Sequence, residues 1–228
     1  MKTVDQSILA TLAEYDSATV QNAGILVRGY IPADEDYTDS RVHEYVSPGA
    51  RPAVGYALTS TWTPLSGEQS DGYARTDYFD SIAKANAPVI VVQQDIDNPS
   101  GRGAIIGDGM AYQMAALGAV GALVEGNARD IPGIEQAGLP LWATGRVPGH
   151  GPFNMIEHDI PVTVASLHIA PGDILVCDAD GATRVAVDEA ADVAEMCAEV
   201  RAKEGALHKF FSVPEFTPAM WDEWKSKS

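Results

Sequence analysis

The feature that most constrains the fold is an alternation of apolar runs and polar tips between residues 104 and 130. Its parts, in order, are the apolar run 104–106, the letters GDG at 107–109, a helical stretch at 110–117, the apolar run 119–124, and Arg129-Asp130. A helix of eight residues spans about 12 Å, which suits one crossover that returns both apolar runs as parallel strands of one sheet. The alternation therefore predicts an α/β fold.

Three charged residues follow the carboxyl ends of these two predicted strands. Asp108 follows the first strand, and Arg129 and Asp130 follow the second. Because ligands of parallel sheets bind beyond the carboxyl ends of strands, we expect the three side chains to meet at one edge. The alternative is a structural role, since Asp is common in Gly-Asp-Gly turns and an Arg-Asp pair in a loop is often merely solvated.

The same edge carries groups suited to an anion and to a cation. Gly107–Met110 opens a helix, whose free amide groups and positive dipole end favour a carboxylate. Arg129 adds a guanidinium, so a substrate with a carboxylate is expected. Two carboxylates without neighbouring histidines are typical of a hard cation, Mg²⁺ or Mn²⁺. The five histidines of the chain share no ligand spacing, and His150, between two glycines, is only a lesser candidate for the site.

The rest of the chain predicts one domain and a tail. Further strands are expected at 53–60, 88–93 and 139–143, three short strands with tight turns after residue 160, and a helix at 188–206. We therefore expect a single α/β domain over residues 1–206 and an aromatic C-terminal tail over 207–228. The tail aromatics either cover a neighbouring subunit or pack on their own domain.

Charge and composition exclude several classes of function. The chain has 32 acidic and 15 basic residues, a formal charge of −17, which repels nucleic acid. It has no apolar stretch long enough to span a membrane and no signal peptide, so no membrane partner and a cytoplasmic location are expected. Its two cysteines, Cys177 and Cys197, are too few for a disulfide framework and are expected to be buried thiols.

Several stretches resemble one known family. GDGMAYQMAALGAVGALVEGNARD at 107–130, followed by LPLWATG, resembles the RraA-like family. APGDILVCDADGATRVAV resembles its Pro-Gly-Asp hairpin, and YDSATVQNAG resembles its N-terminal helix, so the likeness covers about residues 14–190. The family contains class II 4-hydroxy-4-methyl-2-oxoglutarate/4-carboxy-4-hydroxy-2-oxoadipate aldolases, and also regulators of ribonuclease E that lack aldolase activity.

The resemblance implies an αββα sandwich of the swivelling-domain type with a C-terminal helix and tail, assembled as a homotrimer or homohexamer with the site near a subunit interface. It implies a divalent metal held directly by Asp130 and through water by Asp108. It further implies that Arg129 binds the 2-oxo acid and that the loop Gly107, Asp108, Gly109 and Met110 binds its carboxylate. Arg129 and Asp108 are thus the expected catalytic residues.

The function expected from these residues is that of a Mg²⁺- or Mn²⁺-dependent lyase. It would act on a 2-oxo acid such as 4-hydroxy-4-methyl-2-oxoglutarate or oxaloacetate, by retro-aldol cleavage or β-decarboxylation, and release pyruvate through an enolate that the metal stabilises. The alternative is a non-catalytic regulator that binds a ribonuclease or another protein. The chain departs from the family at Gly109, at Glu125-Gly126 and in the loop 145–159.

Overall fold

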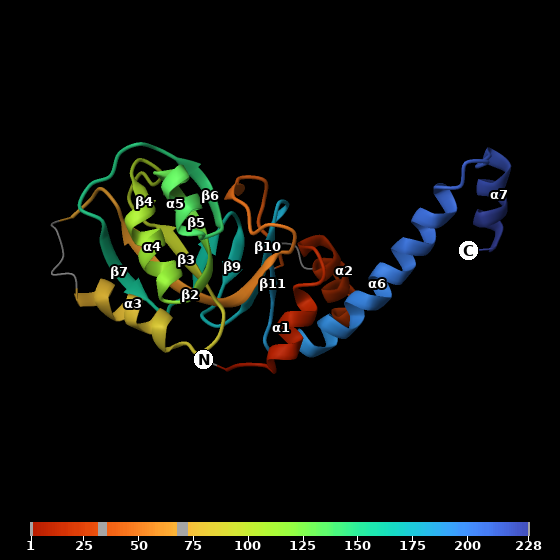
Figure 1. Cartoon of the computed structure of the whole chain (residues 1–228), viewed down its shortest axis with the longest axis horizontal. Coiled ribbons are helices and arrows are strands. Elements are labelled where there is room, and N and C mark those ends of the chain that lie inside the picture. The colour runs from red at the N-terminus through yellow and green to blue at the C-terminus, as the bar shows by residue number, and fades with distance from the viewer. Residues whose placement is uncertain (1, 32–35, 68–72, 228) are drawn as a thin grey trace.

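The computed structural model describes residues 2–31, 36–67 and 73–227 of the chain (Figure 1). The strands are β1 (His43–Val46), β2 (Ala53–Thr63), β3 (Val89–Asp95), β4 (Ala104–Ile106), β5 (Ala119–Ala128), β6 (Leu141–Arg146), β7 (Asn154–His158), β8 (Val162–Val164), β9 (Leu167–Ile169), β10 (Ile174–Asp178) and β11 (Gly181–Val185). The helices are α1 (Gln6–Leu12), α2 (Ser17–Arg28), α3 (Tyr73–Lys84), α4 (Asp108–Ala116), α5 (Ile131–Ala137), α6 (Ala190–Phe211) and α7 (Pro218–Lys227). The predicted α/β class with a C-terminal helix is confirmed.

The main sheet has a parallel centre. Its order is β1-β6-β5-β3-β2-β10-β11, with β4 paired to β5 and β7 paired to β2. The neighbours β2, β3, β5 and β6 are parallel, whereas β1, β7 and β10 join antiparallel. The apolar run of β3 is buried on both faces, as is usual for parallel strands.

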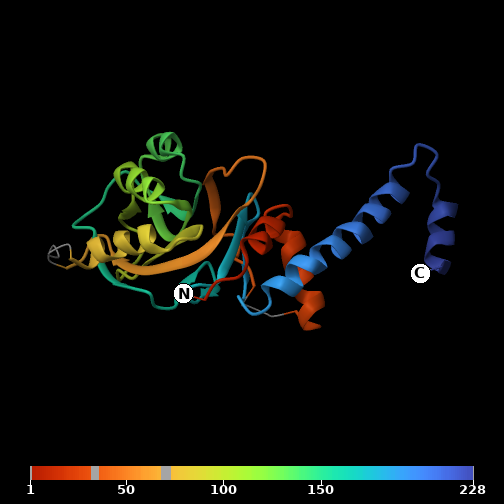
Figure 2. The same ribbon diagram turned by 60° about the horizontal axis from the view of Figure 1, so that its bottom comes forward.

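Alternate residues of the central strands face opposite sides of the sheet and belong to different hydrophobic cores. Val91 and Val124 face a core that α3, α4 and α5 cover, while Ile90 and Leu123 face a core closed by the β8–β9 hairpin. A third core lies where α1, α2 and the first half of α6 pack on β2, β10 and β11 (Figures 1 and 2). The crossover helix α4 therefore lies on the same face as α5, and this places the beginnings of both helices at one edge.

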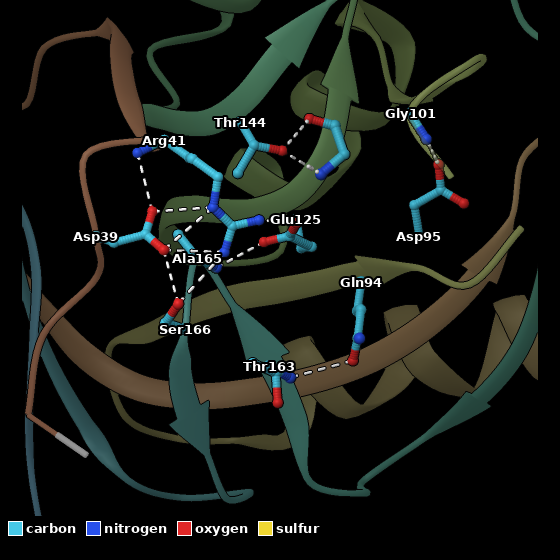
Figure 3. A network of polar contacts seen from close by, with 11 residues as sticks. Asp39, Arg41, Gln94, Asp95, Gly101, Glu125, Thr144, Thr163, Ala165 and Ser166 are labelled. Atoms are coloured by element: carbon cyan, nitrogen blue, oxygen red, sulfur yellow. Dashed lines mark hydrogen bonds and ion pairs between the residues drawn. The ribbon is translucent and has the colours of Figure 1, made fainter. Parts of the chain in front are cut away.

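A polar network attaches the β8–β9 hairpin to β5 (Figure 3). The Glu125 carboxylate accepts a hydrogen bond of 2.5 Å from the amide of Ala165 and one of 3.3 Å from Arg41 Nη1. Arg41 also donates to Asp39, which in turn accepts from the Ser166 hydroxyl at 2.7 Å. The network fixes Ala165 and Ser166 in the left-handed conformation, with φ of 43° and 69°. The strand β5 itself runs to Ala128, beyond the predicted limit of 124.

The helix α6 extends past the domain that it helps to form. Its buried side chains end at Val200, and residues up to Phe211 continue the helix away from the sheet (Figures 1 and 2). The aromatic residues that follow pack on one another, with ring centroids of Phe210 and Trp224 4.4 Å apart and those of Phe211 and Trp221 5.5 Å apart. The sequence left open whether these aromatics pack on their own domain or cover a neighbouring subunit. Among the described residues, their ring contacts are with one another and not with the sheet domain.

Two smaller expectations concern the cysteines and the membrane. Cys177 and Cys197 are free and buried, as predicted, and burial raises the pKa of the Cys197 thiol to about 11. Across the described ranges, no helix combines the length and the apolar character that a membrane crossing requires.

Candidate active site

The carboxyl ends of β4 and β5 lie side by side, as the sequence predicts. The two strands are parallel, and Ile106 is the register partner of Ala128. The amide of Arg129 donates a hydrogen bond of 3.0 Å to the carbonyl oxygen of Ile106. Gly107 and Arg129 therefore lie next to each other, although they are 22 positions apart in the chain.

A bulge in β5 directs the chain toward this edge. Val124 pairs with Ala143 and Asn127 with Gly145, so β5 carries one residue more than β6 over this interval. Thr144 stabilises the bulge, because its hydroxyl accepts a hydrogen bond of 2.8 Å from the Gly126 amide (Figure 3). Gly126 has φ of +143°, and a Cβ there would lie 2.7 Å from Cδ1 of Ile105. Only glycine satisfies both conditions.

Arg129 presents a guanidinium that is only partly engaged. Its Nε lies 3.2 Å from Oδ2 of Asp130. The Nε atom is buried and makes no hydrogen bond within the described part of the chain. The guanidinium carbon lies 6.0 Å from the centre of the Phe153 ring, an arrangement suited to a cation–π contact. The side chain is 30% exposed, so it is held in position yet accessible to a ligand.

Asp130 holds an uncommon backbone conformation that directs its side chain away from its own helix. It precedes α5 with φ of 56° and ψ of 38°, and its carboxylate makes no capping hydrogen bond. A left-handed residue other than glycine costs on the order of 1 kcal/mol. The carboxylate lies instead against Gly107, where a Cβ would come within 3.0 Å of Oδ2. Backbone strain combined with an uncapped helix favours a functional role for this carboxylate.

Asp108 begins α4 and lies against the first turn of α5. A Cβ on Gly133 would lie 2.7 Å from Oδ2 of Asp108. The other oxygen, Oδ1, accepts a hydrogen bond of 2.6 Å from the Gly109 amide. Asp108 is exposed, so solvent and ligands can reach its carboxylate.

These residues line two adjoining hollows. The first, of about 270 Å³, is lined by Arg75, Gly107, Asp108, Gly109, Met110, Gln113, Arg129 and Phe153. The second, of about 410 Å³, is lined by Ala128, Arg129, Asp130, Ile131, Arg146, Val147 and Pro148. All five residues that we expected to bind substrate line the first hollow, which we call the acid hollow. Asp130 lines the second, the aspartate hollow, and Arg129 borders both.

Three residues of the acid hollow were not expected from the sequence. Arg75 comes from α3, Gln113 from the second turn of α4, and Phe153 from the loop after β6. No local pattern singles out Arg75 or Phe153, because tertiary packing alone brings them to this edge. The lesser candidate His150 lies near them, with its ring centre 4.3 Å from that of Phe153.

The donor set suits some metals better than others. Within residues 2–31, 36–67 and 73–227, no group of three or more His, Cys, Asp or Glu side chains gathers as a metal site. The edge offers the carboxylates of Asp108 and Asp130, each in close contact with a glycine of the other segment. Mg²⁺ commonly takes one or two protein carboxylates and completes its shell with water and substrate, whereas structural zinc needs a full protein cage. These residues fit Mg²⁺ or Mn²⁺.

Comparisons with known proteins agree on the fold. A protein of Halalkalibacterium halodurans named "Putative 4-hydroxy-4-methyl-2-oxoglutarate aldolase" is 28% identical over 164 residues, which are 68% of this chain and 78% of that protein. A crystal structure of an uncharacterized protein from Pseudomonas syringae has a TM-score of 0.73 at 21% identity and covers 95% of this chain and 97% of its own. Streptomyces coelicolor RraAS2, described as an unusual member of the RNase ES inhibitor RraA protein family, has a TM-score of 0.73 at 23% identity, with coverages of 91% and 98%.

A family model gives the assignment that these likenesses suggest. The model described as "RraA-like: Aldolase/RraA" matches residues 23–184, which include β4, α4, β5 and all the residues that line the two hollows. The match covers well over half of the chain. The chain therefore belongs to the Aldolase/RraA family.

Proposed function

We propose that this protein is a divalent-metal-dependent lyase that cleaves a 2-oxo acid and releases pyruvate. The observation that carries the proposal is the edge formed by the ends of β4 and β5, where Asp130 and Arg129 lie against Gly107 and the next residue, Asp108, begins α4 and lies against Gly133. The name of the Halalkalibacterium halodurans relative supports the same reaction class. The substrates that suit it are 4-hydroxy-4-methyl-2-oxoglutarate and oxaloacetate.

The acid hollow binds the substrate in this proposal. The first amide groups of α4 and the guanidinium of Arg129 hold the carboxylate and keto oxygen at the reacting end. Arg75, which lines the same hollow, provides a second cation, and this suits a substrate with a second carboxylate. Phe153 contacts the guanidinium of Arg129. Two positive groups on one hollow therefore favour a dianion and help to orient it.

Asp130 would hold the cation directly and Asp108 would hold it through water. When bound, Mg²⁺ or Mn²⁺ supplies Lewis-acid polarisation of the keto group. Arg129 stabilises the negative charge that develops on the keto oxygen when the C3–C4 bond breaks, an effect worth a few kcal/mol for a well-placed donor.

Asp108 is the group that takes up the proton. Retro-aldol cleavage requires removal of the C4 hydroxyl proton, and the exposed carboxylate of Asp108 can accept it through one water molecule. β-Decarboxylation of oxaloacetate releases CO₂ and needs no such base. Loss of Asp108 should therefore affect the aldol reaction more than the decarboxylation.

The test measures pyruvate release by the full chain from both substrates, with Mg²⁺ and with EDTA. We expect metal-dependent release by the unmodified protein and a loss of at least about 100-fold in Asp130→Asn. Asn keeps the shape of Asp and tolerates the left-handed conformation. Asp159→Asn is the matched control, because Asp159 also has a positive φ, of 59°, and lines neither of the two hollows.

Two results would contradict the proposal. Full activity of Asp130→Asn would remove the carboxylate from the reaction. No pyruvate from either substrate, at any Mg²⁺ or Mn²⁺ concentration, would favour the alternative of a non-catalytic regulator that binds a protein partner.

A further inference from the structure

The C-terminal helical arm, residues 201–227, makes few contacts with the rest of the chain. The buried residues of α6 are Ala190, Val193, Ala194, Cys197 and Val200, and no residue from 201 to 211 is buried. Figures 1 and 2 show from two directions that the second half of α6 and the whole of α7 project away from the sheet. Helices in water gain most of their stability from tertiary packing, so an arm without such packing is marginal.

The arm nevertheless carries apolar side chains that remain open to solvent. Leu207 is 39% exposed, Phe211 43% and Trp221 39%, despite the ring contacts that join α6 to α7. Exposed aromatic residues concentrated at one point are typical of protein interfaces.

The charge of the arm differs from that of the remaining chain. Residues 201–228 hold five of the 15 basic residues and four of the 32 acidic residues. The arm therefore has a formal charge of +1, and residues 1–200 have a charge of −18. Two copies of this protein repel each other over most of their surface, but the arm of one is attracted to the remainder of the other.

A surface that could receive the arm lies beside α2. A hollow of about 380 Å³ is lined by Ser17, Ala18, Gln21, Ile25, Ile31, Tyr37, Thr38, Asp180, Ala182 and Thr183. Ile31 is 70% exposed and Tyr37 50%, and the neighbouring Leu26 and Tyr30 are 47% and 60% exposed. The exposed Asp180 places a negative charge at the same hollow, which we call the α2 hollow. Its apolar lining and acidic edge complement the apolar, slightly basic arm.

The positions of the arm and the α2 hollow suit an exchange between two copies. α2 packs on the first half of α6, so the hollow lies at the end of the domain from which the arm departs (Figure 1). A helix of 22 residues spans about 33 Å. If two copies place α6 antiparallel about a two-fold axis, the tip of each arm reaches the base of the other. Both contacts are then identical, as an isologous interface requires.

We propose that the arm of one copy occupies the α2 hollow of a second copy, and that the second arm does the same in return. Leu207, Phe211 and Trp221 provide the apolar contacts, and Tyr37 receives them. Because the contact is pairwise, the assembly contains an even number of copies. A hexamer has such two-fold contacts between its trimers, whereas an isolated trimer has none.

The first experiment measures the mass of the full chain in solution by size exclusion with light scattering. We expect an even multiple of 24.2 kDa for the unmodified protein, and half that mass for the double variant Leu207→Asp/Trp221→Asp. Tyr37→Asp should halve the mass as well. Ile156→Asp is the matched control, since Ile156 is 51% exposed on β7, away from both surfaces, and its mass should be unchanged. Circular dichroism confirms that each variant is folded.

A second experiment locates the contact by mixing two single variants under oxidising conditions. Trp221→Cys mixed with Tyr37→Cys should give a disulfide-linked dimer, because both native cysteines are buried and do not compete. Trp221→Cys mixed with Tyr112→Cys, at a residue of α4 that is 51% exposed, should not. A monomer, an odd number of copies, an arm variant of unchanged mass, or cross-linking at Tyr112 in place of Tyr37 would overturn the proposal.

Discussion

Asp108 on α4 and Gly133 on α5 are in such close contact that no side chain fits between them. A Cβ on Gly133 would lie 2.6 Å from Cβ and 2.7 Å from Oδ2 of Asp108. The missing side chain of Gly133 therefore sets the position of a carboxylate that we assign to the reaction. The contact joins the first turns of two helices that belong to different strand ends.

Gly133→Ala should displace Asp108 while leaving the backbone unstrained, because Gly133 has no positive φ. We expect kcat/KM for retro-aldol cleavage to fall at least about 10-fold, and the free energy of unfolding to fall by about 1–3 kcal/mol from overpacking. Pyruvate release and urea unfolding measure the two effects. Gly149→Ala is the control, since a Cβ there meets open space. Unchanged kinetics in Gly133→Ala would show that the position of Asp108 does not matter to the reaction.

Arg75→Ala should weaken binding of substrates with a second carboxylate. Removing a charged hydrogen-bond partner of a carboxylate costs roughly 1.5–3 kcal/mol, so KM should rise about 10-fold or more with little change in kcat. The measurement compares steady-state kinetics on oxaloacetate for Arg75→Ala and for Arg102→Ala, an exposed arginine that lines neither hollow. An equal response of the two variants would place the second carboxylate elsewhere.

Glu125→Ala should destabilise the protein without direct effect on the site. The amide of the buried Ala165 loses the carboxylate that accepts its hydrogen bond of 2.5 Å, and an unsatisfied buried donor costs about 1–3 kcal/mol. Urea unfolding should show this decrease in the free energy of unfolding. Glu157→Ala, at an exposed glutamate of β7, should stay within about 0.5 kcal/mol of the unmodified protein. A decrease of the same size in both variants would contradict a special role for Glu125.

The stabilising effect of Asp39 should depend on pH in the acid range. Hydrogen bonds from the Arg41 side chain are the main cause that lowers the pKa of Asp39 from 3.8 to about 2. Because the folded pKa is below the unfolded one, the stabilisation is complete above about pH 4 and is lost as the pH falls through about 2. Asp39→Asn should therefore be less stable than the unmodified protein at pH 6, and the difference should shrink toward pH 2. The side chain is 36% exposed, so added salt should reduce the difference. A pH-independent difference would rule out the carboxylate charge as its source.

The parallel unit and its charged tips could be predicted from sequence because both depend on local order. An apolar run, a crossover helix and a second apolar run admit few arrangements, and the pairing of Ile106 with Ala128 follows from them. The end of β5 could not be predicted as easily. Glu125 and Asn127 look like loop residues, but their side chains bond to Ala165 and to Gly101 across the fold.

Other features depended on contacts that sequence spacing does not encode. Arg75 and Phe153 reach the acid hollow from segments that lie far from residues 107–130 in the chain. The sequence predicts a helix at 188–206, but α6 continues to Phe211. Its buried face ends at Val200, where the helix leaves the sheet domain, and the helix itself does not stop there.

The position of Arg129 between the acid hollow and the aspartate hollow has a thermodynamic consequence. A single guanidinium faces both spaces. A substrate carboxylate bound in the acid hollow neutralises the positive charge of Arg129, which would otherwise repel a cation from the aspartate hollow. Each ligand should therefore raise the affinity for the other by the same factor, so that their binding is cooperative and reciprocal.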